Sequence, residues 1–544
     1  MIRILRVVVL RVIPVILMLA LGLAILYYGA QVISAIGRVD GERGLIEGRD
    51  DAYRQTATAI NVTHDEARFP LEMQIVYVGD VNIAQFATNT PQPAGDAFAT
   101  STPAAPQDTA PTATPQPVQF DATPGPLPTI LFLGEPSADE RAKAPTEIPP
   151  AIEVVPRNHN LVNILLMGQD NELTGESIAR TDTMIVVSIN RDTNTVSMLS
   201  LPRDLYIYMP LAGMNRLNVT YGVGENLGWN GGAFFYMRQV LLYNLGINVH
   251  YFAMVDLSGF ATLIDRIGGI DLAVDCAIQD YPLIGAEVPA AAIKAEDSNL
   301  YTLPVGYYHL SGAEALWYAR SRENSDDFDR GRRQQQILRA AFRQALASGV
   351  LNDVLQLPGL INEGLQVVDT DLSANDILSL VPVALSVNPD QIENFRLIRT
   401  YHTQPWQPPD GAFVQLPVRE TLFDLMVDFY TPPTANQLSL TDASIRVKNG
   451  TANDQWDRLV AERLGWSNIG AVPAGAADRT DYGSTVVIDY TGSDKGSILP
   501  LVLRAVNVRP ENVIIQPDAN REVDFEVIVG ADYSSCTGAV LPPQ

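Results

Sequence analysis

The chain has 544 residues, a formal net charge of −25 at pH 7 and 47% hydrophobic residues. At about 100–200 residues per domain, this length predicts two or three folded units. The acidic balance argues against a nucleic-acid partner, because binding a phosphate backbone needs a broad basic surface. The two cysteines, Cys276 and Cys536, permit neither a disulfide framework nor a Cys-based zinc site. They could form one bridge, but their separation in sequence favours two unpaired thiols.

The N-terminus carries a predicted membrane segment, residues 1–36. Three arginines within the first eleven residues precede an uncharged run over residues 12–36, and roughly 20 apolar residues suffice to span a bilayer. A cleaved secretory signal is the alternative, but its apolar core is usually ~7–15 residues, so an uncleaved anchor is favoured. The basic flank predicts a cytoplasmic N-terminus, a single pass through the cell membrane and an extracytoplasmic body.

The next two segments are not expected to form a core. Residues 37–87 are a polar extracytoplasmic segment of unclear structure, with a candidate strand at residues 71–81. Residues 88–150 are dominated by Pro, Thr, Ala and Gln. Such a composition cannot bury enough apolar surface to order itself. It predicts an extended spacer that holds the rest of the chain away from the membrane.

A folded domain is expected over residues 151–431. Residues 161–168 form an apolar run typical of a buried strand, and residues 184–201 are expected to fold as a hairpin. Helices and strands then alternate, which predicts an α/β fold with a central sheet and flanking helices. The expected helices are residues 232–245, 258–267 with Ser258 as N-cap, 313–318, 352–362 and 373–385 with Ser373 as N-cap, and the further strands are residues 249–256, 270–274 and 395–399.

Charged residues gather at the ends of the predicted strands. Asp170, Asp182, Arg203 and Asp204 all fall there, where the sites of sheet proteins are usually found. Two carboxylates near one sheet edge, Asp170 and Asp182, can hold Mg²⁺ through oxygen ligands. The alternative is that Asp170 caps a loop and Asp182 forms a turn.

An arginine cluster occupies residues 317–337, WYARSRENSDDFDRGRRQQQI. Arginine is planar and always charged, and its donor fork matches phosphate oxygens. Arg320 and Arg322 share a face if their segment is extended. Arg330 and Gln334 share a face if theirs is helical. The alternative is a solvated charged helix, but the apolar residues just before Arg320 indicate a buried segment and favour a phosphate or pyrophosphate site.

These motifs resemble those of the LytR–CpsA–Psr family of bacterial envelope proteins. The resemblance covers residues 160–345 and is carried by NILLMGQD at 163–170, RTDTMIVVSIN at 180–190, MLSLPRD at 198–204, RLN at 216–218, IGGID at 267–271, LSGAEALWYARSR at 310–322 and DFDRGRRQQQIL at 327–338. It implies a central sheet with helices on both faces and an apolar pocket for a polyprenyl chain. It also implies a transferase that moves a glycopolymer from undecaprenyl pyrophosphate to peptidoglycan and forms a phosphodiester.

The resemblance also implies roles for individual residues. Asp170 and Asp182 are the implied Mg²⁺ ligands. The implied pyrophosphate-binding and catalytic residues are Arg203, Arg320, Arg322, Arg330 and Gln334, with Asp327 steadying the arginines and Arg216 in the family's basic position before an asparagine. The general base is not identified. Asp204 is a candidate, but a carboxylate paired with arginine is expected to have a lowered pKa and to be a weak base. His309 is near in sequence, but a lone histidine is more often structural than a general base.

A second, smaller domain is expected after a linker at residues 432–443, which begins with two prolines. Residues 444–533 again alternate strands and helices and resemble the C-terminal α/β domain of some family members. Residues 534–544 are expected to be a disordered tail.

Two functions of different class remain open. The first is the Mg²⁺-dependent transferase, whose partners are a polyprenyl-pyrophosphate-linked glycan and a peptidoglycan acceptor. The alternative is a non-catalytic polyprenyl-phosphate-binding envelope protein that acts as a scaffold or regulator. Two candidate metal ligands favour the enzyme, since a lipid-binding protein has no need of them.

Overall fold

The computed structural model describes only part of the chain. The described residues are 75–78, 130–133, 136–156, 160–169, 180–349, 357–433, 443–492 and 497–536. The predicted membrane segment, Asp170 and most of the predicted spacer lie outside them. Among the described helices, none combines the length and apolar character needed to cross a membrane. Two short strands, β1 (Ile75–Val78) and β2 (Ile130–Leu133), pair antiparallel.

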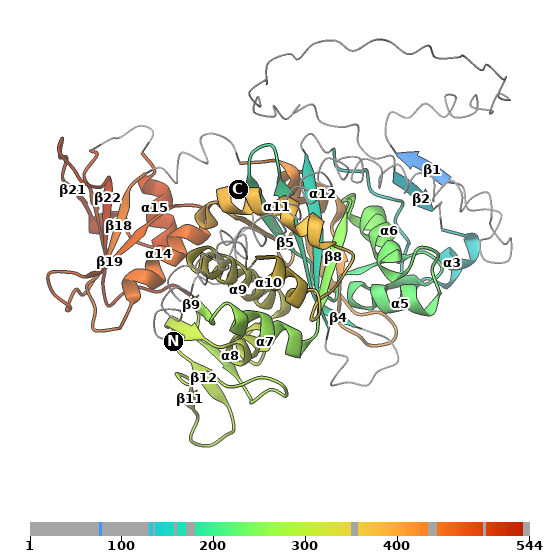
Figure 1. Cartoon of the computed structure of the whole chain (residues 1–544), viewed down its shortest axis with the longest axis horizontal. Helices are drawn as coiled ribbons and strands as arrows, with labels where there is room; N and C mark the ends of the chain where they lie inside the picture. Colours follow the sequence, from blue (N-terminus) through green and yellow to red (C-terminus); the bar gives the residue numbers. More distant parts are fainter. Residues whose placement is uncertain are drawn as a thin grey trace, which may run out of the picture.

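A six-stranded sheet in the order β14-β8-β3-β4-β5-β15 forms the centre of the molecule (Figure 1). In chain order its strands are β3 (Leu161–Gln169), β4 (Thr181–Asn190), β5 (Thr195–Ser200), β8 (Tyr251–Val255), β14 (Asp369–Thr370) and β15 (Glu393–Arg396). Strands β4 and β5 form the predicted antiparallel hairpin. Strands β8 and β15 pair in parallel with β3 and β5, so segments far apart in sequence complete the sheet.

Helices cover both faces of this sheet. One face packs on α5 (Thr220–Asn226), α6 (Ala233–Leu245) and α12 (Arg419–Tyr430), and the other packs on α9 (Asp327–Ala347) and α11 (Ala374–Ser386). Neighbouring strand residues point to opposite faces. Met184 therefore joins the α6 side while Ile185 joins the α9 side. The predicted α/β class with a central sheet and helices is confirmed.

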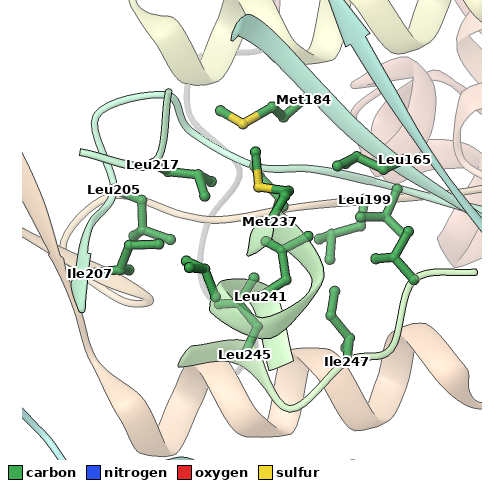
Figure 2. Packing of buried hydrophobic residues seen from close by; sticks show 14 of the residues in the cluster. Leu165, Met184, Leu199, Leu205, Ile207, Leu217, Met237, Leu241, Leu245 and Ile247 are labelled. Carbon is green, nitrogen blue, oxygen red and sulfur yellow. The ribbon is translucent and has the colours of Figure 1, made fainter. Parts of the chain in front are cut away.

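The apolar layer between the sheet and α6 is closely packed (Figure 2). Leu165 and Leu199 from the sheet and Met237 and Leu241 from α6 are all fully buried. Full burial of a side chain of this kind contributes about 1.5–3 kcal/mol relative to exposure. These apolar contacts hold α6 against the sheet.

Smaller elements surround the sheet. They are β6 (Tyr206–Met209) paired with β7 (Gly213–Arg216), β9 (Ile270–Val274) paired with β13 (Gly306–Leu310), a sheet of β10 (Ile278–Asp280), β11 (Ile293–Lys294) and β12 (Tyr301–Leu303), β16 (Thr403–Trp406) paired with β17 (Val414–Pro417), and helices α7 (Leu257–Arg266), α8 (Gly312–Arg320) and α10 (Leu357–Gly364). Ser373 caps α11 as predicted. The cap of α7 is Asp256 rather than Ser258, because the Asp256 carboxylate accepts a hydrogen bond from the Gly259 backbone at 2.6 Å.

The end of the predicted spacer is folded. Helix α3 (Ala138–Lys143) lies within it, and the Glu140 carboxylate accepts hydrogen bonds from the Tyr208 hydroxyl at 2.9 Å and the Leu211 backbone at 3.0 Å. Ile148 is 2% exposed. The structure thus differs from the predicted spacer over residues 136–150, because a few apolar and charged side chains find partners on the domain despite the Pro-rich composition before them.

The C-terminal unit is a five-stranded sheet in the order β19-β18-β22-β20-β21 with two helices. Its elements are β18 (Ile445–Asn449), α14 (Trp456–Trp466), β19 (Val472–Ala476), β20 (Val486–Asp489), α15 (Leu499–Val506), β21 (Val513–Ile515) and β22 (Phe525–Val529). It docks through α14, where the Gly465 carbonyl accepts a 2.6 Å hydrogen bond from Arg339 on α9. Ala273 of β9 belongs to the same buried cluster as the α14 core residues.

A disulfide joins Cys276 and Cys536, so the expectation of two unpaired cysteines is wrong. The bond connects the end of β9 to the chain after β22. Ser535, which is 3% exposed, donates a hydrogen bond to the Asp275 carbonyl beside the bridge. Residues 534–536 are therefore held in place and are not part of a disordered tail. A long separation in sequence says nothing about distance once two sheets have docked.

Glu393 on β15 gives a prediction for stability. Its side chain is 8% exposed, and burial together with the Asp428 charge raises the pKa of Glu393 from 4.5 to about 7. Between these values the folded chain holds a proton that the unfolded chain releases, so the free energy of unfolding falls as pH rises through this window. Glu393→Gln should remove this dependence and stabilise the protein at pH 8 by up to about 3 kcal/mol.

Denaturant unfolding at pH 5 and pH 8 checks this. The matched control is Glu420→Gln, because Glu420 is an exposed carboxylate on α12. An unchanged pH dependence in Glu393→Gln would show that Glu393 is ionised in the folded protein.

Candidate functional site

A pocket lies between the hairpin β4–β5, the loop after β5 and the first turns of α9. It brings together a set of predicted site residues: Asp182, Arg203, Asp327, Arg330 and Gln334. Its empty volume is about 340 Å³, part of which is open to solvent. Asp182 and Gln334, which are 152 positions apart in sequence, therefore share one site.

The start of α9 orients three of these side chains. The Asp326 carboxylate caps the helix by accepting a 2.9 Å hydrogen bond from the Asp329 backbone, so the helix begins at Asp327. Positions three or four apart share a helix face. Asp327, Arg330 and Gln334 consequently face the pocket together. The predicted common face of Arg330 and Gln334 is present.

Gly331 allows α9 to lie close against the sheet. The Ser200 hydroxyl of β5 donates a 3.2 Å hydrogen bond to the Gly331 carbonyl. A Cβ atom at position 331 would come within 3.1 Å of the Ser200 Cβ, which is tighter than ordinary contact. The absence of a side chain here keeps the arginines of α9 next to the ends of β4 and β5.

Arg203 connects the two carboxylates of the pocket. Its Nη1 lies 2.8 Å from Asp182 Oδ2 and its Nε lies 2.9 Å from Asp327 Oδ2. Burial disfavours ionisation of both carboxylates, but the positive charges of Arg203 and Arg330 lower the pKa of Asp182 and of Asp327 below the ordinary value. Both are ionised at neutral pH, so the charges of the site exist before any ligand arrives.

Arg330 is a buried cation that lies among two carboxylates and two further arginines. It is 6% exposed, donates to the Asp182 carbonyl at 3.0 Å and lies 3.4 Å from the Asp327 carboxylate. Burial lowers the pKa of Arg330, and the charges of Arg203 and Arg322 lower it further, which together outweigh the carboxylates. A bound anion would relieve this repulsion, so the pocket is electrostatically suited to phosphate oxygens.

Asp204 does not have the lowered pKa that its pairing with arginine predicts. It lies 3.6 Å from Arg203 Nε and 3.7 Å from Arg216 Nη1. Burial and the neighbouring Asp327 charge nevertheless raise the pKa of Asp204, because they outweigh both arginines. The argument against Asp204 as a base is therefore wrong on this point. Among the described charged residues, Arg216 pairs with Asp204 and does not line the pocket.

Arg320 and Arg322 do not line this pocket. Arg320 is the last residue of α8, so the expected extended segment is helical at this position. Its Nη1 donates to the Ile284 carbonyl at 2.7 Å. Arg322 has an exposed side chain, and its backbone N–H donates to the Asp280 carboxylate at 2.6 Å. Asp170, the second predicted metal ligand, lies outside the described residues.

Two further arginines of the cluster are structural. Arg332 lies 2.5 Å from the Asp275 carboxylate and 2.8 Å from Asp329. Arg333 is fully buried and donates hydrogen bonds to the carbonyls of Tyr318 and Ser321. They attach α9 to the chain just after β9 and to the end of α8.

The described residues include no group of three or more His, Cys, Asp or Glu side chains that could hold a metal ion. Mg²⁺ is commonly bound by one or two carboxylates together with substrate phosphates, and it keeps several waters. Asp182 fits that role, since its carboxylate is ionised and, within the described part of the chain, its Oδ1 accepts one hydrogen bond, from Asn218 Nδ2 at 3.2 Å.

Arg396 also lines the pocket, and the motifs did not reveal it. It is the last residue of β15, opposite Ser200 at the end of β5. The sequence placed it in a predicted strand but gave no signal that this strand would join β5. Only the parallel pairing of two segments almost 200 residues apart brings it to the site.

Comparison with known proteins gives the same assignment as the motifs. Residues 133–420 match the model of the LytR_cpsA_psr family. Polyisoprenyl-teichoic acid–peptidoglycan teichoic acid transferase TagU of Oceanobacillus iheyensis is 30% identical over 227 residues, which cover 41% of this chain and 63% of that relative. Regulatory protein MsrR of Staphylococcus aureus is 32% identical over 190 residues, which cover 35% of this chain and 50% of that relative.

Among solved structures, the crystal structure of Bacillus subtilis TagV matches with a TM-score of 0.39 and 24% sequence identity. The match covers 50% of this chain and 98% of the TagV chain. The chain spans less than two thirds of the length of both curated relatives. The family match, by contrast, covers more than half of the chain. This protein therefore belongs to the LytR_cpsA_psr family.

Proposed function

We propose that this protein is a membrane-anchored phosphotransferase that moves a glycopolymer from undecaprenyl pyrophosphate onto peptidoglycan. The observation that carries the proposal is the pocket in which Asp182 meets Arg203 and Arg330. Membership of the family supports it, as does the name of TagU, a teichoic acid transferase acting between a polyisoprenyl carrier and peptidoglycan.

The proposed reaction is a phosphoryl transfer. A hydroxyl of peptidoglycan attacks the phosphorus that carries the glycan, a new P–O bond forms, and the bond to the bridging oxygen breaks. Polyprenyl phosphate leaves with that oxygen, and the hydroxyl proton passes to a base or to water. Catalysis of this kind consists mainly of positioning and charge stabilisation.

The residues of the pocket suit these tasks. Arg203 and Arg330 would bind the pyrophosphate oxygens and stabilise the negative charge on the leaving phosphate. Gln334 lines the pocket beside them and would exchange its hydrogen bond to the Thr183 hydroxyl for one to a phosphate oxygen, and Asp327 holds both arginines in position. Asp182, with Asp170, would hold Mg²⁺, which when bound supplies positive charge to the phosphate oxygens.

The surroundings of the pocket suit a lipid-linked substrate. Met184 and Leu201 line the pocket and also belong to the buried cluster under α6. Phe328 lines it as well and packs against that cluster. A pyrophosphate bound by the arginines would thus lie next to apolar side chains, where a polyprenyl chain could begin.

The proposal places the body of the protein outside the cell, attached to the membrane by residues 12–36. A transfer assay tests the function: the full chain is mixed with a pyrophosphate-linked polyprenyl glycan and peptidoglycan oligomers, with and without Mg²⁺. Magnesium-dependent product and released polyprenyl phosphate are expected. Tight lipid binding without product would instead favour a scaffold or regulator, a role in keeping with the name of the relative MsrR.

Arg320→Ala gives a further test of the site. Although Arg320 lies outside the pocket, its guanidinium holds the loop at Ile284, and the resemblance assigns it to the pyrophosphate. We expect transfer to fall by about 10- to 100-fold, the loss of one charge-assisted contact, with little change in stability. Arg266→Ala on α7, which removes an arginine paired with Glu363, is the control. Equal activity of the two variants would remove Arg320 from the site.

A further inference from the structure

Arg396 differs from the other arginines of the pocket in having no partner. Among the described residues, its guanidinium makes no hydrogen bond or ion pair, whereas Arg203 and Arg330 both contact Asp182 and Asp327. Burial and the charge of Arg332 lower the pKa of Arg396 to about 10. Asp329 and Asp275 favour its charge from beyond ion-pair distance, but burial and the neighbouring arginines outweigh them, so this guanidinium is only weakly compensated in the folded state.

The arginines of the pocket differ in how many of their N–H donors already bind an acceptor. Arg203 uses Nε and Nη1 on two carboxylates, and Arg330 uses Nη2 on a carbonyl. These contacts position the two arginines but reduce the number of N–H groups they can offer. Arg396 keeps its whole donor fork, whose planar geometry matches two phosphate oxygens. It therefore adds both positive charge and unused donors to one side of the pocket.

We propose that Arg396 binds one phosphate of a diphosphate held in this pocket and makes the site prefer a diphosphate over a monophosphate. Arg203 and Arg330 already face Asp182 and Asp327, so their charges are partly neutralised. A diphosphate carries more negative charge than a monophosphate and spans a longer distance. The second phosphate requires another cation, and Arg396 supplies it from a strand outside the family motifs.

This inference rests on the proposed function, since both place a pyrophosphate in the same pocket. It adds a consequence for the reaction. The leaving group is a monophosphate, which has fewer oxygens and less negative charge to share among Arg396 and the other two arginines. Arg396 thus strengthens binding of the substrate more than binding of the product.

Calorimetric titration of the full chain with inorganic pyrophosphate and with inorganic phosphate tests the inference. Arg396→Gln should weaken pyrophosphate binding by about 10- to 100-fold and phosphate binding much less. Arg396→Lys keeps the charge but loses the fork, so it should fall between Arg396→Gln and the wild type. Arg399→Gln is the matched control, because Arg399 is on the same segment but pairs with Asp326 and does not line the pocket.

The melting temperature of the ligand-free protein gives an independent readout. Arg396→Gln should leave it unchanged or raise it, since the substitution removes an unpartnered cation. Three results would overturn the inference. The first is an equal affinity of Arg396→Gln and wild type for pyrophosphate, and the second is no pyrophosphate binding by the wild type. The third is a lower melting temperature of Arg396→Gln together with an equal loss of affinity for pyrophosphate and phosphate.

The transfer assay separates this inference from the proposed function. If the wild type transfers a glycan and Arg396→Gln binds pyrophosphate normally, only the inference fails. If pyrophosphate binding depends on Arg396 but no transfer occurs, only the proposed function fails.

Discussion

Replacing Asp182 by asparagine is expected to lower the rate of glycopolymer transfer by about 10²–10³-fold, the usual cost of losing one electrostatic group aimed at the reacting atoms. The carboxylate lies 2.8 Å from Arg203 and is the proposed Mg²⁺ ligand for which the structure gives a position. Asparagine keeps the shape of the side chain but removes its charge. Arg203 and Arg330 then repel each other with less compensation, and the proposed Mg²⁺ site would lose an anionic ligand.

The same substitution should cost only about 1–3 kcal/mol of stability, because Arg203 retains Asp327 as a partner. The lowered pKa of Asp182 means that its ion pair contributes fully above the unfolded value of 3.8 and is lost as pH falls through the folded value. The stability difference between wild type and Asp182→Asn should therefore shrink in acid. Denaturant unfolding at pH 7 and pH 3 measures it.

Asp192→Asn is the matched control for activity, because Asp192 lies on the exposed turn at the other end of the β4–β5 hairpin. Transfer by that variant should be normal. If Asp182→Asn also transferred at the wild-type rate, Asp182 would have no part in the reaction, and retained activity in Arg320→Ala as well would refute the assigned site.

Breaking the disulfide between Cys276 and Cys536 is expected to have the largest effect on stability. The bond closes a loop across 260 positions of sequence, and a crosslink over so long a loop strongly restricts the unfolded chain. We expect reduction to lower the free energy of unfolding by about 3–5 kcal/mol. The tail around Tyr533, which is buried against the C-terminal unit, should loosen first.

Thermal unfolding with and without dithiothreitol measures this effect. The double variant Cys276→Ser with Cys536→Ser should melt at the temperature of the reduced wild type and should not respond to the reductant. A wild-type melting temperature that is the same in both conditions would mean that the bridge adds nothing to stability. Transfer activity should change less than stability, because the bridge does not line the pocket.

Local patterns determined much of the fold in advance. The β4–β5 hairpin, helix α6 and the Ser373 cap follow from apolar periodicity and capping chemistry, which depend only on near neighbours. The common face of Arg330 and Gln334 follows in the same way from a four-residue spacing. The exact ends of helices were harder to predict from the sequence. The N-cap of α7 is Asp256 and not Ser258.

The sequence by itself determined the α/β class, the family motifs and the charged residues from which the site is built. Only the tertiary structure decided which arginines serve the pocket: Arg330 faces it, Arg332 and Arg333 are buried in structural contacts, and Arg396 joins it from β15. The pairing of Cys276 with Cys536 was likewise settled by docking of the two sheets. The physical reason is that periodicity reports which residues share a face, whereas the partner of that face depends on long-range packing that no local pattern encodes.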